Sequence, residues 1–184
     1  MTVEARAVLG HRSADLERLG ARELTSLHQA SLRLEVLEAL GPHPVLPPTV
    51  PNTWAAVGGR ELLWLGPDEW LVVGEPGDAG VIAWLEEAFA RLHRSIVDVS
   101  ANRAVLEFHG DDRRNLLAAG CGLDLHQRSW RDGMCAQTLL GRVSVLLQER
   151  GHATRVFVRA SFAGSLVDLL VAFARAEEAL RSKA

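Results

Sequence analysis

The sequence predicts an α+β fold in which helices cover a mainly antiparallel sheet. Strand patterns come in pairs joined by short turns, and three helical patterns are interleaved with them. The regular alternation of strand and helix that is typical of parallel sheets does not occur. We expect one domain over residues 1–184, with room for two lobes whose boundary lies near residues 41–54.

The first half of the chain predicts a short helix, a strand, an extended segment and a hairpin. Ser13 is placed to cap a helix that runs to Leu19, and alternating apolar residues predict a half-buried strand over 31–36. Five prolines in residues 41–51 exclude regular helix and indicate an extended surface segment. Apolar runs at 62–65 and 70–73 flank a Gly-Pro-Asp-Glu sequence that is typical of a type I turn.

The second half predicts three helices and five strands. An amphipathic helix over 78–93 precedes strands over 96–99 and 104–108. Asp111 is placed to cap a short helix that Gly120 ends, and further strands are expected near 138–140, 143–147 and 155–158. A long helix over 161–181 follows, and its expected apolar stripe is Phe162, Leu166, Leu169, Leu170, Phe173 and Leu180.

Composition disfavours several classes of function. The net charge is −3, the chain has one lysine, and no basic cluster indicates nucleic-acid binding. No apolar run has the length of a membrane span, and residues 1–6 lack the features of a secretion signal. Two cysteines are too few for a disulfide framework, so we expect a cytoplasmic protein with reduced thiols.

Motifs for cofactor chemistry are incomplete or missing. The phosphate-binding pattern G-x-x-x-x-G-K-[ST] is absent, and the nearest approach to a dinucleotide fingerprint, at residues 120–125, lacks its third glycine. The clustered candidate metal ligands have spacings unlike those of structural zinc sites; they are Cys121, Asp124, His126 and Cys135. The nucleophile motif G-x-S-x-G is also absent, so we expect no catalytic residue and no cofactor or metal bound by this chain.

Three groups of side chains have alternative interpretations. Asp98 lies in an apolar strand, so we expect a buried carboxylate paired with Arg103 or with a backbone amide. The pairs at 68–69 and 111–112 fit turn and helix-cap positions. Tryptophans around the hairpin either fill the core or mark a protein interface; they are Trp54, Trp64 and Trp70. The candidates for a partner interface are Trp64, Asp68, Glu69 and Trp70.

Five segments together resemble the gamma subunit of heterotetrameric sarcosine oxidases. The most specific is Leu63-Trp64-Leu65-Gly66-Pro67-Asp68-Glu69-Trp70-Leu71, which is close to the family pattern L-W-L-G-P-D-E-W-L. The others are Val97-Asp98-Val99-Ser100, Gly120-Cys121-Gly122-Leu123-Asp124-Leu125-His126, Cys135-Ala136-Gln137-Thr138 and Val158-Arg159-Ala160-Ser161-Phe162-Ala163. In order and spacing they cover about residues 52 to 182.

The resemblance implies a fold similar to the first domain of the glycine-cleavage aminomethyltransferase and of the tRNA-modification GTPase. It implies a non-catalytic subunit that assembles with alpha, beta and delta subunits. The implied complex demethylates sarcosine oxidatively to glycine, with hydrogen peroxide and methylene-tetrahydrofolate as further products. FAD, FMN and NAD would be held by alpha and beta, and zinc by delta.

Two alternatives remain open at this stage. One is a stand-alone folate-binding protein of the aminomethyltransferase-like group. Against it, the K-G-C-Y-x-G-Q-E pattern of one such branch is missing, and the chain has no tyrosine. The other is a gamma-type subunit of a related amine-oxidising complex, such as N-methylglutamate dehydrogenase, because the substrate would bind on another subunit.

Overall fold

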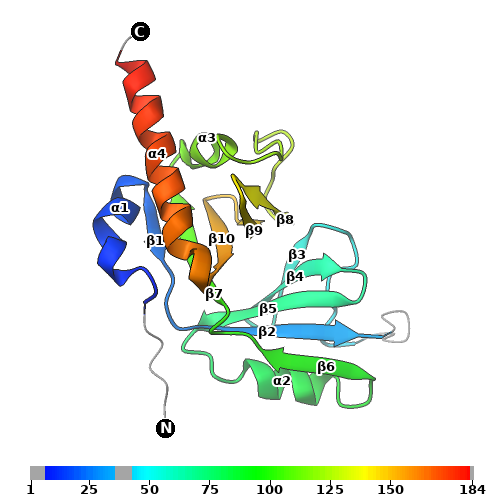
Figure 1. The fold of residues 1–184 in the computed structure, drawn as a ribbon. Coiled ribbons are helices and arrows are strands. Elements are labelled where there is room, and N and C mark those ends of the chain that lie inside the picture. Colours follow the sequence, from blue (N-terminus) through cyan, green and yellow to red (C-terminus); the bar gives the residue numbers. More distant parts are fainter. Residues whose placement is uncertain (1–6, 36–42, 183–184) are drawn as a thin grey trace. The chain divides into compact units, whose positions relative to one another are not determined.

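The chain forms two compact units in the computed structural model, which describes residues 7–35 and 43–182. The first unit contains the described residues up to Thr25, Arg103–Asp132 and the residues from Gln137 onward. The second contains Ser26–Asn102 and Gly133–Ala136. Each unit is built on a five-stranded sheet (Figure 1).

The sheet of the first unit has the strand order β1-β7-β10-β9-β8. The pairs β1–β7, β7–β10 and β10–β9 are antiparallel, and β8 begins with two residues that group with the second unit. The central strands β7 and β10 are buried along most of their length, so alternation of apolar and polar residues is weak in them. The strands span Ala21–Glu23 (β1), Arg103–His109 (β7), Ala153–Arg159 (β10), Val143–Glu149 (β9) and Cys135–Leu140 (β8).

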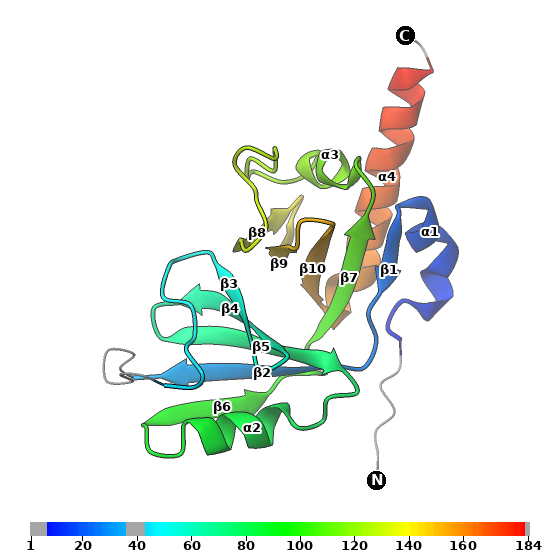
Figure 2. The ribbon, with the colours of Figure 1, turned by 180° about the vertical axis from the view of Figure 1, so that it is seen from behind.

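Three helices accompany this sheet, with α4 running beside α1 (Figures 1 and 2). A short 3₁₀ turn, η1 (Gly10–Arg12), leads into α1 (Ser13–Arg18), and α3 spans Arg113–Ala118. After a second 3₁₀ turn, η3 (Ala160–Phe162), α4 runs from Ala163 to Arg181. Its buried residues recur at helical spacing and are Ala163, Leu166, Val167, Leu170 and Val171.

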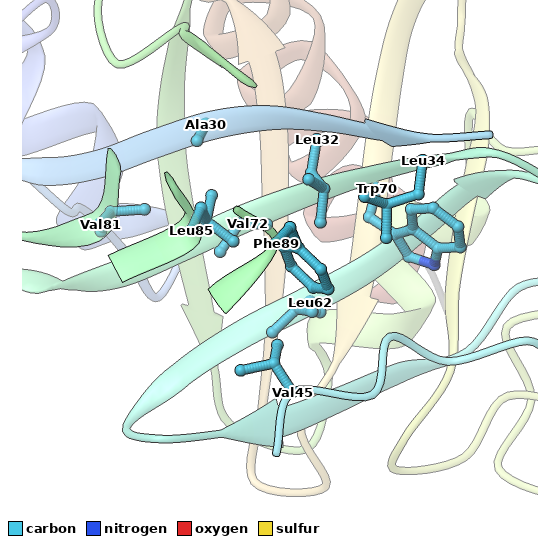
Figure 3. Close-up of a cluster of buried hydrophobic side chains, with 10 residues drawn as sticks. All are labelled: Ala30, Leu32, Leu34, Val45, Leu62, Trp70, Val72, Val81, Leu85 and Phe89. Carbon is cyan, nitrogen blue, oxygen red and sulfur yellow. The ribbon is translucent and has the colours of Figure 1, made fainter. Parts of the chain in front are cut away.

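The sheet of the second unit has the order β3-β4-β5-β2-β6, and every neighbouring pair is antiparallel. Helix α2 (Val81–Ala88) packs on one face, where Val81, Leu85 and Phe89 meet side chains of β2, β4 and β5 (Figure 3). The strands are Trp54–Val57 (β3), Arg60–Gly66 (β4), Glu69–Pro76 (β5), Leu27–Leu34 (β2) and Arg94–Asp98 (β6).

The predicted α+β class is confirmed, as are the hairpin at Pro67 and Asp68 and the long C-terminal helix. The structure differs in having two antiparallel sheets where one was expected, and strands β1 and β3 were not predicted. Both are short, at three and four residues, which leaves too few positions for a periodic pattern. Val36, the last residue of the strand predicted over 31–36, lies outside the described residues.

Several helix boundaries also differ from the prediction. Helix α2 is shorter than residues 78–93, Ser13 is the first residue of α1, and Asp112 instead of Asp111 holds the N-cap position of α3. Neither α1 nor α3 has a side-chain cap hydrogen bond. Two residues of the predicted stripe of α4 are exposed because they lie beyond its packed turns: Phe162 at 51% and Leu180 at 71%.

The chain passes between the units at residues 25–26, 102–103, 132–133 and 136–137, not near residues 41–54. Residues 41 and 42 of the predicted boundary lie outside the described part, and residues 43–54 belong to the second unit. Residues 43–53 are neither helix nor strand, as their prolines predict, but the segment is not confined to the surface, because Val45 is buried in the core at 4% exposure. Within the described ranges, no helix has both the length and the apolar character needed to cross a membrane.

Candidate functional site

The tip of the β4–β5 hairpin carries the charged candidates for a partner interface. The strands pair Trp64 with Trp70, and a bulge between Trp64 and Gly66 precedes the two-residue turn. Arg33 on the neighbouring strand β2 donates a 2.8 Å hydrogen bond to Glu69 and lies 3.8 Å from Asp68. Asp68 and Arg33 are each 56% exposed, so this tip presents a solvated cluster of opposite charges.

Trp70 lies in the core of the second unit, not on a surface. Its side chain is fully buried, with Val72 and Leu62 as neighbours in the cluster that α2 covers (Figure 3). Alternate side chains of a strand face opposite sides, and at this position the apolar side faces the helix. The indole Nε1 donates a 2.8 Å hydrogen bond to the carbonyl of Pro48. Of the four candidates, Trp64, Asp68 and Glu69 therefore retain solvent exposure.

The cysteine of the C-A-Q-T segment is a structural thiol. Cys135 is fully buried, and its Sγ donates to the carbonyl of Thr53 at 3.2 Å. Burial raises the pKa of this thiol to about 12. The backbone N–H of Cys135 also donates to the carbonyl of Asn52 at 2.9 Å, so the segment is fixed from both main chain and side chain.

The four candidate metal ligands are not brought into one cluster. Cys135 belongs to the second unit, whereas Cys121, Asp124 and His126 belong to the first. Asp124 accepts hydrogen bonds from the Ser129 hydroxyl at 2.6 Å and from the His126 amide at 3.0 Å, which lower its pKa. Among the residues that the structure describes, no group of three or more His, Cys, Asp or Glu side chains is arranged to hold a metal ion.

Asp98 is exposed, which corrects the expected burial. Strand β6 is the edge of its sheet, so one side of the strand meets solvent even where its sequence is apolar. The carboxylate accepts 2.6 Å and 2.9 Å hydrogen bonds from the hydroxyl and amide of Ser100, and these lower its pKa. Of the two partners that were expected, a backbone amide is therefore present, and the Ser100 hydroxyl is a partner that was not expected.

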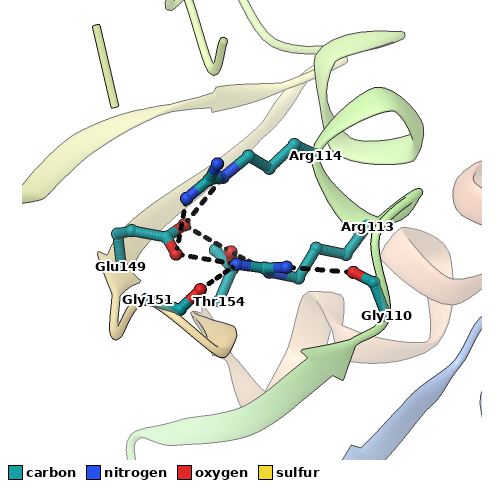
Figure 4. Close-up of polar contacts among 6 residues, drawn as sticks. All are labelled: Gly110, Arg113, Arg114, Glu149, Gly151 and Thr154. Carbon is teal, nitrogen blue, oxygen red and sulfur yellow. Dashed lines mark hydrogen bonds and ion pairs between the residues drawn. The ribbon is translucent and has the colours of Figure 1, made fainter. Parts of the chain in front are cut away.

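A buried ion-pair network in the first unit was not predicted. Glu149 is fully buried and receives hydrogen bonds from Arg113 at 2.9 Å, Arg114 at 3.0 Å and the Thr154 hydroxyl at 2.7 Å (Figure 4). Arg113 also donates to the carbonyls of Gly110 and Gly151. Burying a carboxylate is costly unless donors compensate it, and these hydrogen bonds also tie α3 to the β9–β10 hairpin. In the sequence, the adjacent pair Arg113 and Arg114 was the feature from which this network could have been predicted.

A second charged cluster surrounds Glu107 on β7. Its side chain is 4% exposed and accepts hydrogen bonds from Arg22 at 2.7 Å and Arg155 at 2.8 Å, from the two strands that flank β7. The Nε2 of His109 lies 3.1 Å from the same carboxylate. Burial raises the pKa of Glu107, but the hydrogen bonds from Arg22 and Arg155 outweigh it and lower the pKa to about 2.

The first unit also has an open cavity of about 500 Å³ between α1, α3 and α4. Its charged lining is largely paired internally: Arg18 binds Glu178, Arg181 binds Glu177, and Arg113 is committed to Glu149. Most of the charged side chains around this cavity therefore already have a partner within the chain. The two buried carboxylates of the described residues, Glu107 and Glu149, are likewise paired with arginines.

The chain matches a family model in sequence. The model described as "Sarcosine oxidase, gamma subunit family" matches residues 29–177. The sarcosine oxidase subunit gamma of Corynebacterium sp. (strain U-96) is 34% identical over 139 residues, which are 73% of this chain and 67% of that protein. The subunit of the same name from Arthrobacter sp is 34% identical over 134 residues, 70% of this chain and 66% of that one. The chain thus spans about two thirds of the length of these relatives.

Solved structures are similar in fold. A chain of the heterotetrameric sarcosine oxidase from Corynebacterium sp. U-96, solved in complex with pyrrole 2-carboxylate, superposes with a TM-score of 0.81 at 29% identity. The match covers 92% of this chain and 94% of that chain. The glycine cleavage system aminomethyltransferase T of Bartonella henselae superposes with a TM-score of 0.64 over 86% of this chain and 48% of that chain. At 13% identity the second match shows a shared fold alone.

Proposed function

Because the chain belongs to the sarcosine oxidase gamma subunit family, we propose that it is the gamma subunit of a heterotetrameric oxidase that demethylates sarcosine. The observation that carries this proposal is the similarity to a chain of a heterotetrameric sarcosine oxidase over nearly the whole length of both chains. A fold shared at this level of identity favours a shared role in assembly.

In this proposal the subunit has no active site of its own. Its buried charged groups support that view because they are engaged with one another: Glu149 with two arginines, and Glu107 with two more. The Cys135 thiol, with its raised pKa, is protonated at neutral pH and is a poor nucleophile. These groups are engaged in holding strands and turns together.

The chemistry of the complex would lie on its partners. We assign FAD, FMN and NAD to the alpha and beta subunits and zinc to the delta subunit, with tetrahydrofolate as the acceptor of the one-carbon unit. The products would be glycine, hydrogen peroxide and methylene-tetrahydrofolate. A cytoplasmic location fits the two cysteines, which are both free thiols.

The tip of the β4–β5 hairpin is our candidate for contact with a partner subunit. Asp68 and Glu69 are solvent-accessible there beside Arg33, and Trp64 is half-buried. A charged rim beside an aromatic ring is a common composition for an interface. Trp70 would contribute from the core, by holding the strand that carries the tip.

Co-expression tests the proposal. The purified chain alone should show no visible flavin absorbance and no oxidase activity, whereas co-expression with the alpha, beta and delta subunits should yield one stable, active complex. Recovery of a soluble complex that lacks this chain and keeps full activity would overturn the proposal. Titration of the isolated chain with a reduced folate provides a second test, since tight, saturable binding would favour a folate-binding protein instead.

A further inference from the structure

Residues 43–53 of the second unit form a proline-rich strap that is held in place without being a helix or a strand. At its start, the His43 ring stacks on Phe89 with 5.1 Å between ring centroids and an angle of 8° between the planes. The Nε2 of His43 lies 2.9 Å from the carbonyl of Ala88, the last residue of α2. The start of the strap is therefore fixed to the end of a helix.

The middle of the strap is fixed to the core beneath it. Val45 and Pro47 are buried, and Val45 belongs to the same apolar cluster as Leu62 and Trp70 (Figure 3). The carbonyl of Pro48 accepts the 2.8 Å hydrogen bond from the indole of Trp70. A proline-rich backbone that also makes these contacts loses little further conformational entropy when another protein binds to it.

The end of the strap is fixed by the segment around Cys135. The carbonyl of Asn52 accepts from the Cys135 amide at 2.9 Å, and the carbonyl of Thr53 accepts from the Cys135 thiol at 3.2 Å. The Thr53 hydroxyl donates back to the carbonyl of Val50 at 2.7 Å. Start, middle and end are thus all anchored within one unit.

This anchored segment exposes two large apolar side chains to solvent. Leu46 is 51% exposed and Val50 is 62% exposed, although Val45 and Pro47 beside them are buried. None of the eleven residues 43–53 is Asp, Glu, Lys or Arg, in a protein in which these four types make up 23% of the residues. The other exposed large hydrophobic residues of the described chain lie outside the strap: Val8, Val97, Leu139, Phe162 and Leu180.

We propose that the strap is a docking surface for a partner subunit of the oxidase complex, which receives Leu46 and Val50 in an uncharged, apolar pocket. The inference rests on the proposed function, because the structural relative is a heterotetramer and a different subunit is the expected occupant. An uncharged pocket is the complementary surface for a strap without charges, since an unpaired charge buried against it would be costly. Trp70 is then a positioning residue that acts through the Pro48 carbonyl.

The affinity of the purified chain for the remaining cognate subunits, measured by biolayer interferometry, tests the inference. Replacing both exposed residues (Leu46→Ser with Val50→Ser) should raise the Kd at least about tenfold, as truncation of interface anchors does. Val97→Ser is the matched control, because Val97 on the edge strand β6 is 51% exposed, the same fraction as Leu46. That control should bind as the wild type does.

A second variant tests the positioning role. Trp70→Phe keeps an aromatic ring but removes the N–H that holds Pro48. Hydrogen exchange should increase at the amides of residues 45, 46, 49 and 50 with exchange in β4 unchanged, and the Kd should rise while the protein stays folded. A general loss of packing would instead raise exchange throughout the sheet, and that result would contradict the role of Trp70.

The outcomes separate the two proposals. Wild-type binding with no loss in the double variant would overturn the docking surface and leave the proposed function intact. Light scattering that shows a dimer of the isolated chain, dissolved by the double variant, would identify a second copy as the occupant and also overturn it. Failure of the wild-type chain to bind any cognate subunit would overturn the proposed function, and the docking surface with it.

Discussion

At the scale of residues, Glu107 shows how a charge is kept inside this protein. Its carboxylate is almost completely shielded from solvent, yet strands on both sides direct an arginine toward it. An uncompensated carboxylate in this position would take up a proton. With both arginines in place the charged form is favoured, so the stability of the fold is linked to pH.

We predict that stability falls as pH drops below about 4.5. The folded pKa of Glu107 is about 2, below its ordinary value of 4.5, so its contribution is fully present above pH 4.5 and is lost as pH falls toward 2. The full contribution is on the order of 3 kcal/mol. Urea unfolding at a series of pH values measures it. Glu107→Gln should flatten the curve in this window, and an unchanged acid slope in that variant would contradict the assignment.

The two cysteines should differ in reactivity. Cys135 is fully buried with a pKa of about 12, whereas Cys121 is half-buried beside the Thr138 hydroxyl. Because the thiolate is the reactive form, one thiol per chain should react with Ellman's reagent in the native protein and two in urea. Cys121→Ser should abolish the native reaction. A fast native reaction in that variant would show that Cys135 is accessible.

At the scale of elements, periodic and turn signals were sufficient for the longer pieces. The hairpin followed from proline and aspartate between apolar runs, and α4 followed from its spacing of leucines. The sequence pattern did not predict burial correctly where burial depends on residues that are close in space but distant in the sequence. Asp98 is solvated because β6 is an edge strand, and Glu149 is buried because α3 supplies two arginines. Neither fact is encoded near the residue itself.

The interface candidates also show the difference between features that local sequence predicts and features that depend on distant contacts. Four residues of the hairpin segment were predicted as candidates for a partner interface. Strand alternation places one of them, Trp70, in the core with Val72. The strap was visible in the sequence only as a run of prolines. Its anchoring depends on contacts with Trp70, Phe89 and Cys135, which lie 22, 46 and more than 80 residues away from their partners. Contacts of that range cannot be derived from local pattern.

The Gly120-Cys121-Gly122 segment should be sensitive to substitution at its first glycine and tolerant at its second. A Cβ on Gly120 would lie 2.6 Å from the Phe173 ring of α4 and 3.2 Å from the backbone of Gly141. Nothing lies within 4 Å of a Cβ on Gly122. Gly120→Ala should therefore destabilise by about 1–3 kcal/mol, as overpacking does.

Gly122→Ala is the matched control and should stay within about 0.5 kcal/mol of the wild type. Chemical denaturation with urea compares the two variants under the same conditions. Equal stability of both variants would mean that the contact between Gly120 and Phe173 of α4 is looser than the structure describes. A large loss in both would point to a requirement for glycine in the backbone itself.

At the scale of the whole molecule, the chain builds each unit from separate stretches of sequence. The second unit takes Gly133–Ala136 from within a region that otherwise belongs to the first. Thr53 pairs with Met134 in an isolated antiparallel bridge, and the amides of Trp54 and Cys135 donate to Gly133 and Asn52. The four-residue segment is thereby part of the second unit in hydrogen bonding as well as in packing.

Hydrogen exchange should follow these units and not the order of the sequence. In the intact chain at low urea, the Cys135 amide should exchange with the same opening free energy as the amides of β4 and β5, because all open with the second unit. The amides of Ser129 and Trp130 donate to the His126 carbonyl in the first unit and should follow a different urea dependence. If Cys135 instead exchanges together with Trp130, the segment opens with its sequence neighbours, and the division into two cooperative units fails.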